Sequence, residues 1–188
     1  MKVFLNGLLV VLLSVLVVAG CVHSPEDRVY SPGKGTGRLK KIAVLPFYNI
    51  SGRRDAGRMV ADTYVTELFK SGRYDVEEPG NVLQFMIREH VDTVGEMEIE
   101  RIKILGRRLG VDAVLVGTVE EYDDGLRGVP TVSITARMVD SRTGRIVWSG
   151  HNKRRGDEYI IAFGVGMVRS ASALSQKVIN EMIETMRW

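Results

Sequence analysis

The chain has 188 residues, with 26 basic and 23 acidic side chains and a single cysteine. This near balance of charge gives no argument for nucleic acid as a partner, because nucleic-acid binding needs basic residues clustered on one surface. A single cysteine excludes a disulfide within the chain, so the fold has to depend on its hydrophobic core.

An apolar run at the amino terminus leads directly to that cysteine. Leu8–Val18 reads LLVVLLSVLVV, Lys2 supplies a positive start and small residues follow, which is the layout of a secretory signal peptide. Its last four residues, VAGC, resemble the bacterial lipobox. The resemblance implies cleavage between Gly20 and Cys21 and a covalent lipid on Cys21, which would anchor the mature chain to a membrane. A plain signal peptide or an uncleaved signal anchor is the alternative, but neither requires a cysteine here.

Residues 22–39 contain two prolines, three glycines and no hydrophobic period. Such a composition indicates a flexible tether rather than a packed element. We therefore predict three parts: a signal peptide over 1–20, an acylated cysteine with its tether over 21–39, and a folded domain over 40–188.

The first half of the folded domain alternates strands with helices. The compact apolar run Lys41–Phe47 predicts a buried strand, and a short strand is expected over 74–77. Three helices are predicted from apolar residues that recur at every third or fourth position: 55–70, 79–90 and 98–109. A proline opens the second helix, and glycines follow the first and the third.

The second half predicts three strands and a final helix: 112–119, 131–139, 145–149 and 166–186. The order is therefore β-α-β-α-α-β-β-β-α, an α/β (α+β) chain with a mixed sheet of about five strands packed by helices. Strands separated by helices can pair in parallel, whereas the last three, joined by short turns, form an antiparallel meander.

Three stretches resemble the CsgG-like, TolB-amino-domain-like group of bacterial lipoproteins: Ile42–Ser51, Leu109–Val119 and Ala136–Ser149. That group includes the curli secretion lipoprotein CsgG and the penicillin-binding-protein activator LpoB. The resemblance covers about residues 40–188 and implies the α/β fold. It implies less about function, because strand cores and turns carry it.

One departure from CsgG concerns its pore. The CsgG channel adds long hairpins that assemble in a ring into a membrane barrel, and each membrane-spanning strand takes about 9–11 residues. The connections over 121–129 and 154–163 are too short for such a hairpin and are not alternating and apolar. We therefore expect no pore from this chain, although it could still form a ring.

Two groups of residues are candidates for partner binding. The first is basic and consists of Arg53-Arg54, Arg107-Arg108 and Lys153-Arg154-Arg155. If these clusters meet in space they suit an anionic partner, and otherwise they are solvated faces. The second is the apolar, glycine-broken stretch Tyr159–Val168, which contains Phe163. It is either part of the core or a surface where subunits or partners dock.

Signals for catalysis or for a metal are missing from the sequence. His23, His90 and His151 do not have the spacing of metal ligands, and no nucleophile motif or phosphate loop is present. The acidic run over 120–124 has no ligand loop around it. We therefore expect no metal, no cofactor apart from the lipid on Cys21, and no enzymatic activity.

These observations predict a lipid-anchored protein of the outer membrane that faces the periplasm. It would act through contacts with envelope or secretion proteins, in envelope assembly or secretion. Val22 follows the cysteine where many inner-membrane lipoproteins have aspartate, which favours the outer membrane by family analogy. One alternative is a homo-oligomeric, ring-forming component of CsgG-like export, and another is an enzyme of unknown class.

Overall fold

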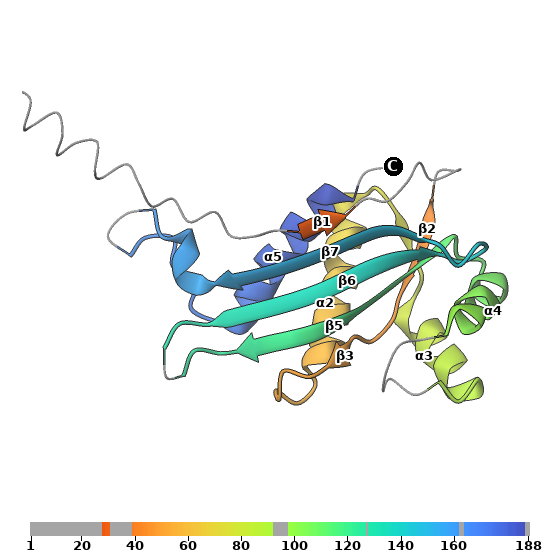
Figure 1. Ribbon diagram of the computed structural model, residues 1–188, viewed down its shortest axis with the longest axis horizontal. Helices are drawn as coiled ribbons and strands as arrows, with labels where there is room; N and C mark the ends of the chain where they lie inside the picture. The colour runs from red at the N-terminus through yellow and green to blue at the C-terminus, as the bar shows by residue number, and fades with distance from the viewer. Residues whose placement is uncertain (1–27, 31–38, 92–97, 127, 162–163, 187–188) are drawn as a thin grey trace, which may run out of the picture.

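The structure is a computed structural model that describes residues 28–30, 39–91, 98–126, 128–161 and 164–186 (Figure 1). The predicted signal peptide, its cleavage site between Gly20 and Cys21, most of the predicted tether and Phe163 lie outside the described residues. The predictions for these residues therefore stay predictions.

Seven strands in the described part of the chain form one mixed sheet (Figure 1). They are β1 (Arg28–Tyr30), β2 (Lys41–Val44), β3 (Tyr48–Asn49), β4 (Asp75–Val76), β5 (Ala113–Asp123), β6 (Thr131–Asp140) and β7 (Ile146–Arg155). The order is β1-β7-β6-β5-β2-β4, and β3 continues the line of β2 along β5. Strand β2 pairs in parallel with β4 and with β5, and β3 also pairs in parallel with β5. Strands β5, β6 and β7 form the antiparallel meander. The predicted α+β class is confirmed, with β1 and β3 added to the expected strands.

Helices cover both faces of this sheet but not equally. They are α2 (Ala56–Ser71), α3 (Pro79–Arg88), α4 (Ile99–Leu109) and α5 (Ala171–Thr185), with the short 3₁₀-helix η1 (Gly156–Tyr159) after β7. Helices α2 and α5 bury one face along β5, β6 and β7. Helices α3 and α4 pack on the other face, chiefly against β2 and the first half of β5.

The first three helices lie within two residues of their predicted bounds. Pro79 occupies the first turn of α3, and Gly72 and Gly110 end α2 and α4 in the left-handed conformation that favours glycine. The prediction for the last helix is wrong at its start, because α5 begins at Ala171 rather than at Gly166. Gly166 has a φ of 94°, which no helix allows, and the Ser170 side chain caps α5 instead.

Strand β7 extends to Arg155, six residues beyond its predicted end at Ser149. Its last residues read as a polar stretch in the sequence, but Asn152 and Arg154 point toward α5 and find polar partners there. Burial thus alternates along the strand although hydrophobicity does not.

Strand β1 lies inside the segment that composition predicts to be a tether. It pairs antiparallel with β7, with Arg28 opposite His151 and Tyr30 opposite Ser149. Its amino-terminal residue therefore lies nearest the carboxyl end of β7.

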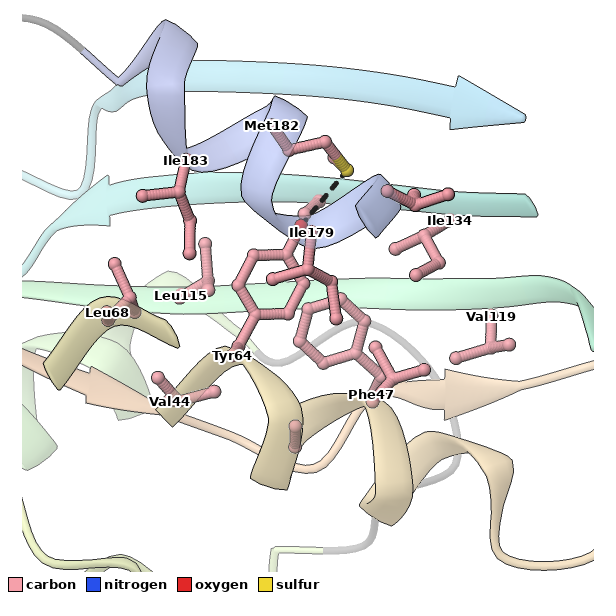
Figure 2. Close-up of a cluster of buried hydrophobic side chains, with 14 of the residues drawn as sticks. Val44, Phe47, Tyr64, Leu68, Leu115, Val119, Ile134, Ile179, Met182 and Ile183 are labelled. Atoms are coloured by element: carbon pink, nitrogen blue, oxygen red, sulfur yellow. Dashed lines mark hydrogen bonds between the residues drawn. The ribbon is translucent and has the colours of Figure 1, made fainter. Parts of the chain in front are cut away.

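The core between the sheet and helices α2 and α5 centres on Tyr64 (Figure 2). The Tyr64 ring stacks on Phe47, with 5.2 Å between centroids, and its hydroxyl donates to the Met182 sulfur at 3.1 Å. Complete burial raises the pKa of Tyr64 far above its usual value, so the hydroxyl stays protonated. The Phe47 ring fits because Gly117 of β5 lies directly beneath it: a Cβ there would overlap the ring and the Thr135 carbonyl.

We expect Gly117→Ala to lower the free energy of unfolding by about 1–3 kcal/mol, because the added methyl forces Phe47 off the Tyr64 ring. Urea denaturation of the two proteins measures the difference. Gly128→Ala is the matched control: no atom lies within 4 Å of its added Cβ, and the smaller entropy of its unfolded chain should change stability by less than about 1 kcal/mol. Equal effects at the two positions would contradict this account of the core.

Candidate functional site

Three chain segments meet where β5 ends, β6 begins and β7 ends. Asp123 lies opposite Thr131, which lies opposite Arg155, so these three residues form one row across the sheet. We call this the distal end; beyond it lie the described residues of the β5–β6 connection, η1 and the segments over 160–161 and 164–170 (Figure 1).

Backbone hydrogen bonds through Gly156 hold the segments of the distal end together. The Gly156 amide donates to the Pro130 carbonyl at 2.9 Å, and the Val168 amide donates to the Gly156 carbonyl at 2.9 Å. A Cβ on Gly156 would overlap the Val168 carbonyl, so this close approach requires glycine.

An ion pair between the buried Arg154 and the partly exposed Glu181 fixes η1 and the end of β7 to helix α5. Both Nε and Nη2 of Arg154 lie 3.0 Å from the Glu181 carboxylate, and the Arg154 side chain is only 10% exposed. The same carboxylate accepts from Asn152 Nδ2 at 3.0 Å and from the Tyr159 hydroxyl at 2.7 Å. Burial, together with the hydrogen bond to Glu181, raises the pKa of Tyr159, so Tyr159 remains a donor at any physiological pH.

Four of the other basic residues in the proposed binding clusters pair with a nearby carboxylate. The pairs are Arg53–Asp124 at 2.5 Å, Lys153–Glu121 at 2.6 Å, Arg155–Asp157 at 3.1 Å and Arg108–Glu89 at 2.6 Å. Arg54 is exposed beside the first pair.

Only part of the predicted basic set converges. Arg53, bound to Asp124, lies at the distal end with the 153–155 run, whereas Arg107-Arg108 precede the opposite end of β5. Arg154 differs from its neighbours, because it serves the interior rather than the surface. A role in partner binding for the exposed members of the set stays a prediction.

Apolar side chains are exposed at the distal end. Ile161 is 86% exposed, Val165 65% and Ile160 41%. The Ile161 amide donates to the Val165 carbonyl at 2.8 Å, so the segment closes on itself as a small loop. In the described part of the stretch, Val168 is buried in the core and Tyr159 packs against that core. Each of the two interpretations therefore holds for part of this stretch: the described residues over 160–165 lie on the surface, and Val168 at its end lies in the core.

Leu126, at the tip of the β5–β6 connection, is 92% exposed at the same end of the sheet. Sequence reasoning treated this connection only as a short loop and missed Leu126. The available signal was a single large apolar residue among the charged and glycine residues over 123–128.

The sheet face opposite α5 carries a polar cluster over β5, β6 and β7. A β-bulge between Val119 and Glu121 places Glu120 and Glu121 side by side on this face. Glu120 accepts from Ser133 at 2.8 Å and from Thr135 at 2.6 Å, and Thr135 Oγ1 lies 3.0 Å from His151 Nδ1. We call this surface the open face, because α3 and α4 pack on it only near β2 and the start of β5.

The histidines in the described residues are separated, with His90 exposed after α3 and His151 in the open-face cluster. Within these residues, no group of three or more histidine, cysteine, aspartate or glutamate side chains is arranged to hold a metal ion. The helices of the same part of the chain are too short or too polar to cross a membrane.

We expect Glu181→Ala to cost about 1–3 kcal/mol of unfolding free energy, because it removes the carboxylate that accepts from the buried Arg154 guanidinium, from Asn152 and from Tyr159. The control is Glu121→Ala, which breaks the exposed pair with Lys153 and should cost less than about 1 kcal/mol. Denaturant unfolding gives both values. Amide exchange at Val168 should also quicken in the first variant alone. Equal costs would show that the Arg154–Glu181 pair does not organise the distal end.

Comparison with known proteins gives a consistent set of relatives. The family model described as "Putative lipoprotein GNA1162-like" matches residues 7–187. A Neisseria meningitidis serogroup B protein, "Putative lipoprotein NMB1124/NMB1162", is 31% identical over 151 residues, which are 78% of this chain and 69% of that protein. The crystal structure of lipoprotein GNA1162 from Neisseria meningitidis is 28% identical with a TM-score of 0.52, covering 78% of this chain and 99% of GNA1162.

More distant solved structures share the fold alone. The PelC dodecamer from Paraburkholderia phytofirmans has a TM-score of 0.59 at 23% identity, covering 85% of this chain and 95% of that one. The LpoB C-terminal domain from Salmonella enterica has a TM-score of 0.51 at 15% identity, covering 65% and 87%. The wider CsgG-like and TolB-like grouping stays a prediction. The family match and the Neisseria relative together establish that the chain belongs to the GNA1162-like lipoprotein family.

Proposed function

We propose that this chain is an outer-membrane lipoprotein that faces the periplasm, is held by a lipid on Cys21, and acts without catalysis by binding envelope or secretion proteins. Membership of a lipoprotein family and the VAGC sequence support the anchor. The observation that carries the binding role is the open face, a rigid sheet surface whose polar groups are already oriented by one another.

The chemistry of the open face suits a polar protein partner. Glu120, Thr135 and His151 are partly exposed, and their hydrogen bonds hold donors and acceptors in fixed positions on adjacent strands. Pre-organised polar groups bind a partner at a smaller entropic cost than flexible side chains do. The Lys153–Glu121 pair extends this surface toward the distal end.

A second candidate function is a homo-oligomeric, ring-forming component of CsgG-like export. The observation that favours it is that PelC, which shares the fold, forms a dodecamer. In that case the partner of the open face, or of another surface, would be a second copy of this chain.

The anchor predicts a clear effect of Cys21→Ser on the full-length protein. Wild-type protein should be found in the outer-membrane fraction with residues 1–20 removed and a lipid-sized mass added at Cys21, whereas the variant should lose the added mass and that location. His23→Ser, two residues beyond the cysteine, should behave as wild type. Membrane fractionation measures the location of each protein, and intact-mass measurement shows whether residues 1–20 are removed and the lipid is added. Wild-type protein that retains residues 1–20 would contradict the proposal.

A photo-crosslinking amino acid at Thr118, on the open face, should capture a different envelope protein in intact cells, because this face is proposed to bind one. The same substitution at Asp62, on the exposed side of α2, serves as control. Gel mobility and mass spectrometry identify the adducts. Adducts of the chain with itself would favour the ring-forming alternative. Absence of any adduct at Thr118 beyond those at Asp62 would refute binding at this face.

A further inference from the structure

The proposed binding role of the open face does not explain the exposed aliphatic side chains of the distal end. Ile161, Val165 and Leu126 are each more than half exposed, and they project from two loops rather than from one flat surface. Exposure of such side chains to water is unfavourable, so we expect an environment that removes them from water.

The register of β1 indicates what that environment is. Because β1 runs antiparallel to β7 with Arg28 opposite His151, Arg28 is the residue of β1 that lies nearest Arg155 and the distal end. His151 and Arg155 are four residues apart, about 13 Å along a strand. Cys21 lies seven positions before Arg28, and this stretch of chain spans at most about 25 Å. The proposed lipid on Cys21 is therefore within reach of the end of the sheet where the aliphatic side chains lie.

We propose that the distal end is a second membrane contact: Ile160, Ile161, Val165 and Leu126 insert into the leaflet that holds the acyl chains of Cys21. This inference rests on the proposed lipid anchor and extends it. The anchor tethers the domain, and the distal end orients it, with the sheet standing away from the membrane.

The surroundings of these side chains suit the boundary between headgroups and acyl chains. Arg155 and Arg169 are exposed on the two sides of the loop over 160–168, where their guanidinium groups can reach lipid phosphates while the aliphatic groups lie deeper. The bond from the Ile161 amide to the Val165 carbonyl satisfies two of the polar backbone groups that would accompany these side chains into an apolar layer, which lowers the cost of insertion.

A second copy of the chain is the competing occupant. Stable protein interfaces use about 20–30 residues from each partner, with a contiguous buried core. Four aliphatic side chains on two projecting loops fall well short of that, whereas insertion into lipid requires no complementary surface. The bilayer is therefore the occupant that these observations favour.

The experiment uses full-length protein, acylated in a bacterial host and reconstituted into vesicles of phosphatidylethanolamine and phosphatidylglycerol. Cys21 is the only cysteine and its thiol is blocked by the lipid, so a new cysteine takes a polarity-sensitive fluorophore alone. Ile161→Cys and Leu126→Cys report on the distal end. Ile146→Cys, exposed at the other end of β7, is the matched control.

With nitroxide-labelled lipid in the vesicles, the probes at 161 and 126 should be quenched and should emit at shorter wavelength, and the probe at 146 should do neither. Protein that floats with the vesicles but shows equal quenching at 161 and 146 overturns the membrane contact and leaves the anchor intact. Protein without the lipid mass that fails to float overturns the anchor and this inference together. Shielding of the 161 probe from iodide without any lipid quenching overturns the inference and assigns the distal end to contact between copies.

Discussion

The last third of the chain depends on one half-hidden ion pair. Glu181 of α5 receives Arg154, Asn152 and Tyr159, which come from β7 and η1. These bonds fix where β7 ends and how the following segment turns back to α5. An unpaired guanidinium in this position would be costly, so the pair selects one arrangement of strand and helix over others. Because the segment over 160–168 starts from this point, the exposure of Ile161 and Val165 at the distal end follows from it.

The sheet thus presents surfaces of different chemistry in fixed relation to each other. One face is buried by α2 and α5 around the Tyr64–Phe47 stack, and the open face carries the Glu120 cluster. The distal end carries aliphatic groups bordered by paired charges. The register of β1 on β7 relates these surfaces to the amino-terminal chain. In the proposed account the distal end faces lipid, which leaves the open face available to periplasmic partners of a GNA1162-like lipoprotein.

Sequence predicted the elements whose signal is local. Helices α2, α3 and α4 have an apolar period and proline or glycine at their ends, so their bounds were nearly right. The predicted end of β7 was too early because the buried residues of its last part are polar. Arg154 has its partner, Glu181, 27 positions away in the sequence. No local pattern shows that one arginine of Lys153-Arg154-Arg155 is interior. Strand β1 lies among proline and glycine and is defined only by the edge of β7. From the sequence, the exposure of Ile160, Ile161 and Val165 could be posed as one of two alternatives but not decided, since composition is the same for core and for docking surface.

The central claim is that the distal end, and not the opposite end of the sheet, faces the membrane. Hydrogen–deuterium exchange of the acylated protein on vesicles, compared with Cys21→Ser protein in solution, tests it most directly. The account predicts slower exchange over 160–166 and 124–128 on vesicles, with unchanged exchange in the β6–β7 turn over 141–145 at the other end. Unchanged exchange over 160–166, or equal slowing at the two ends, would contradict it.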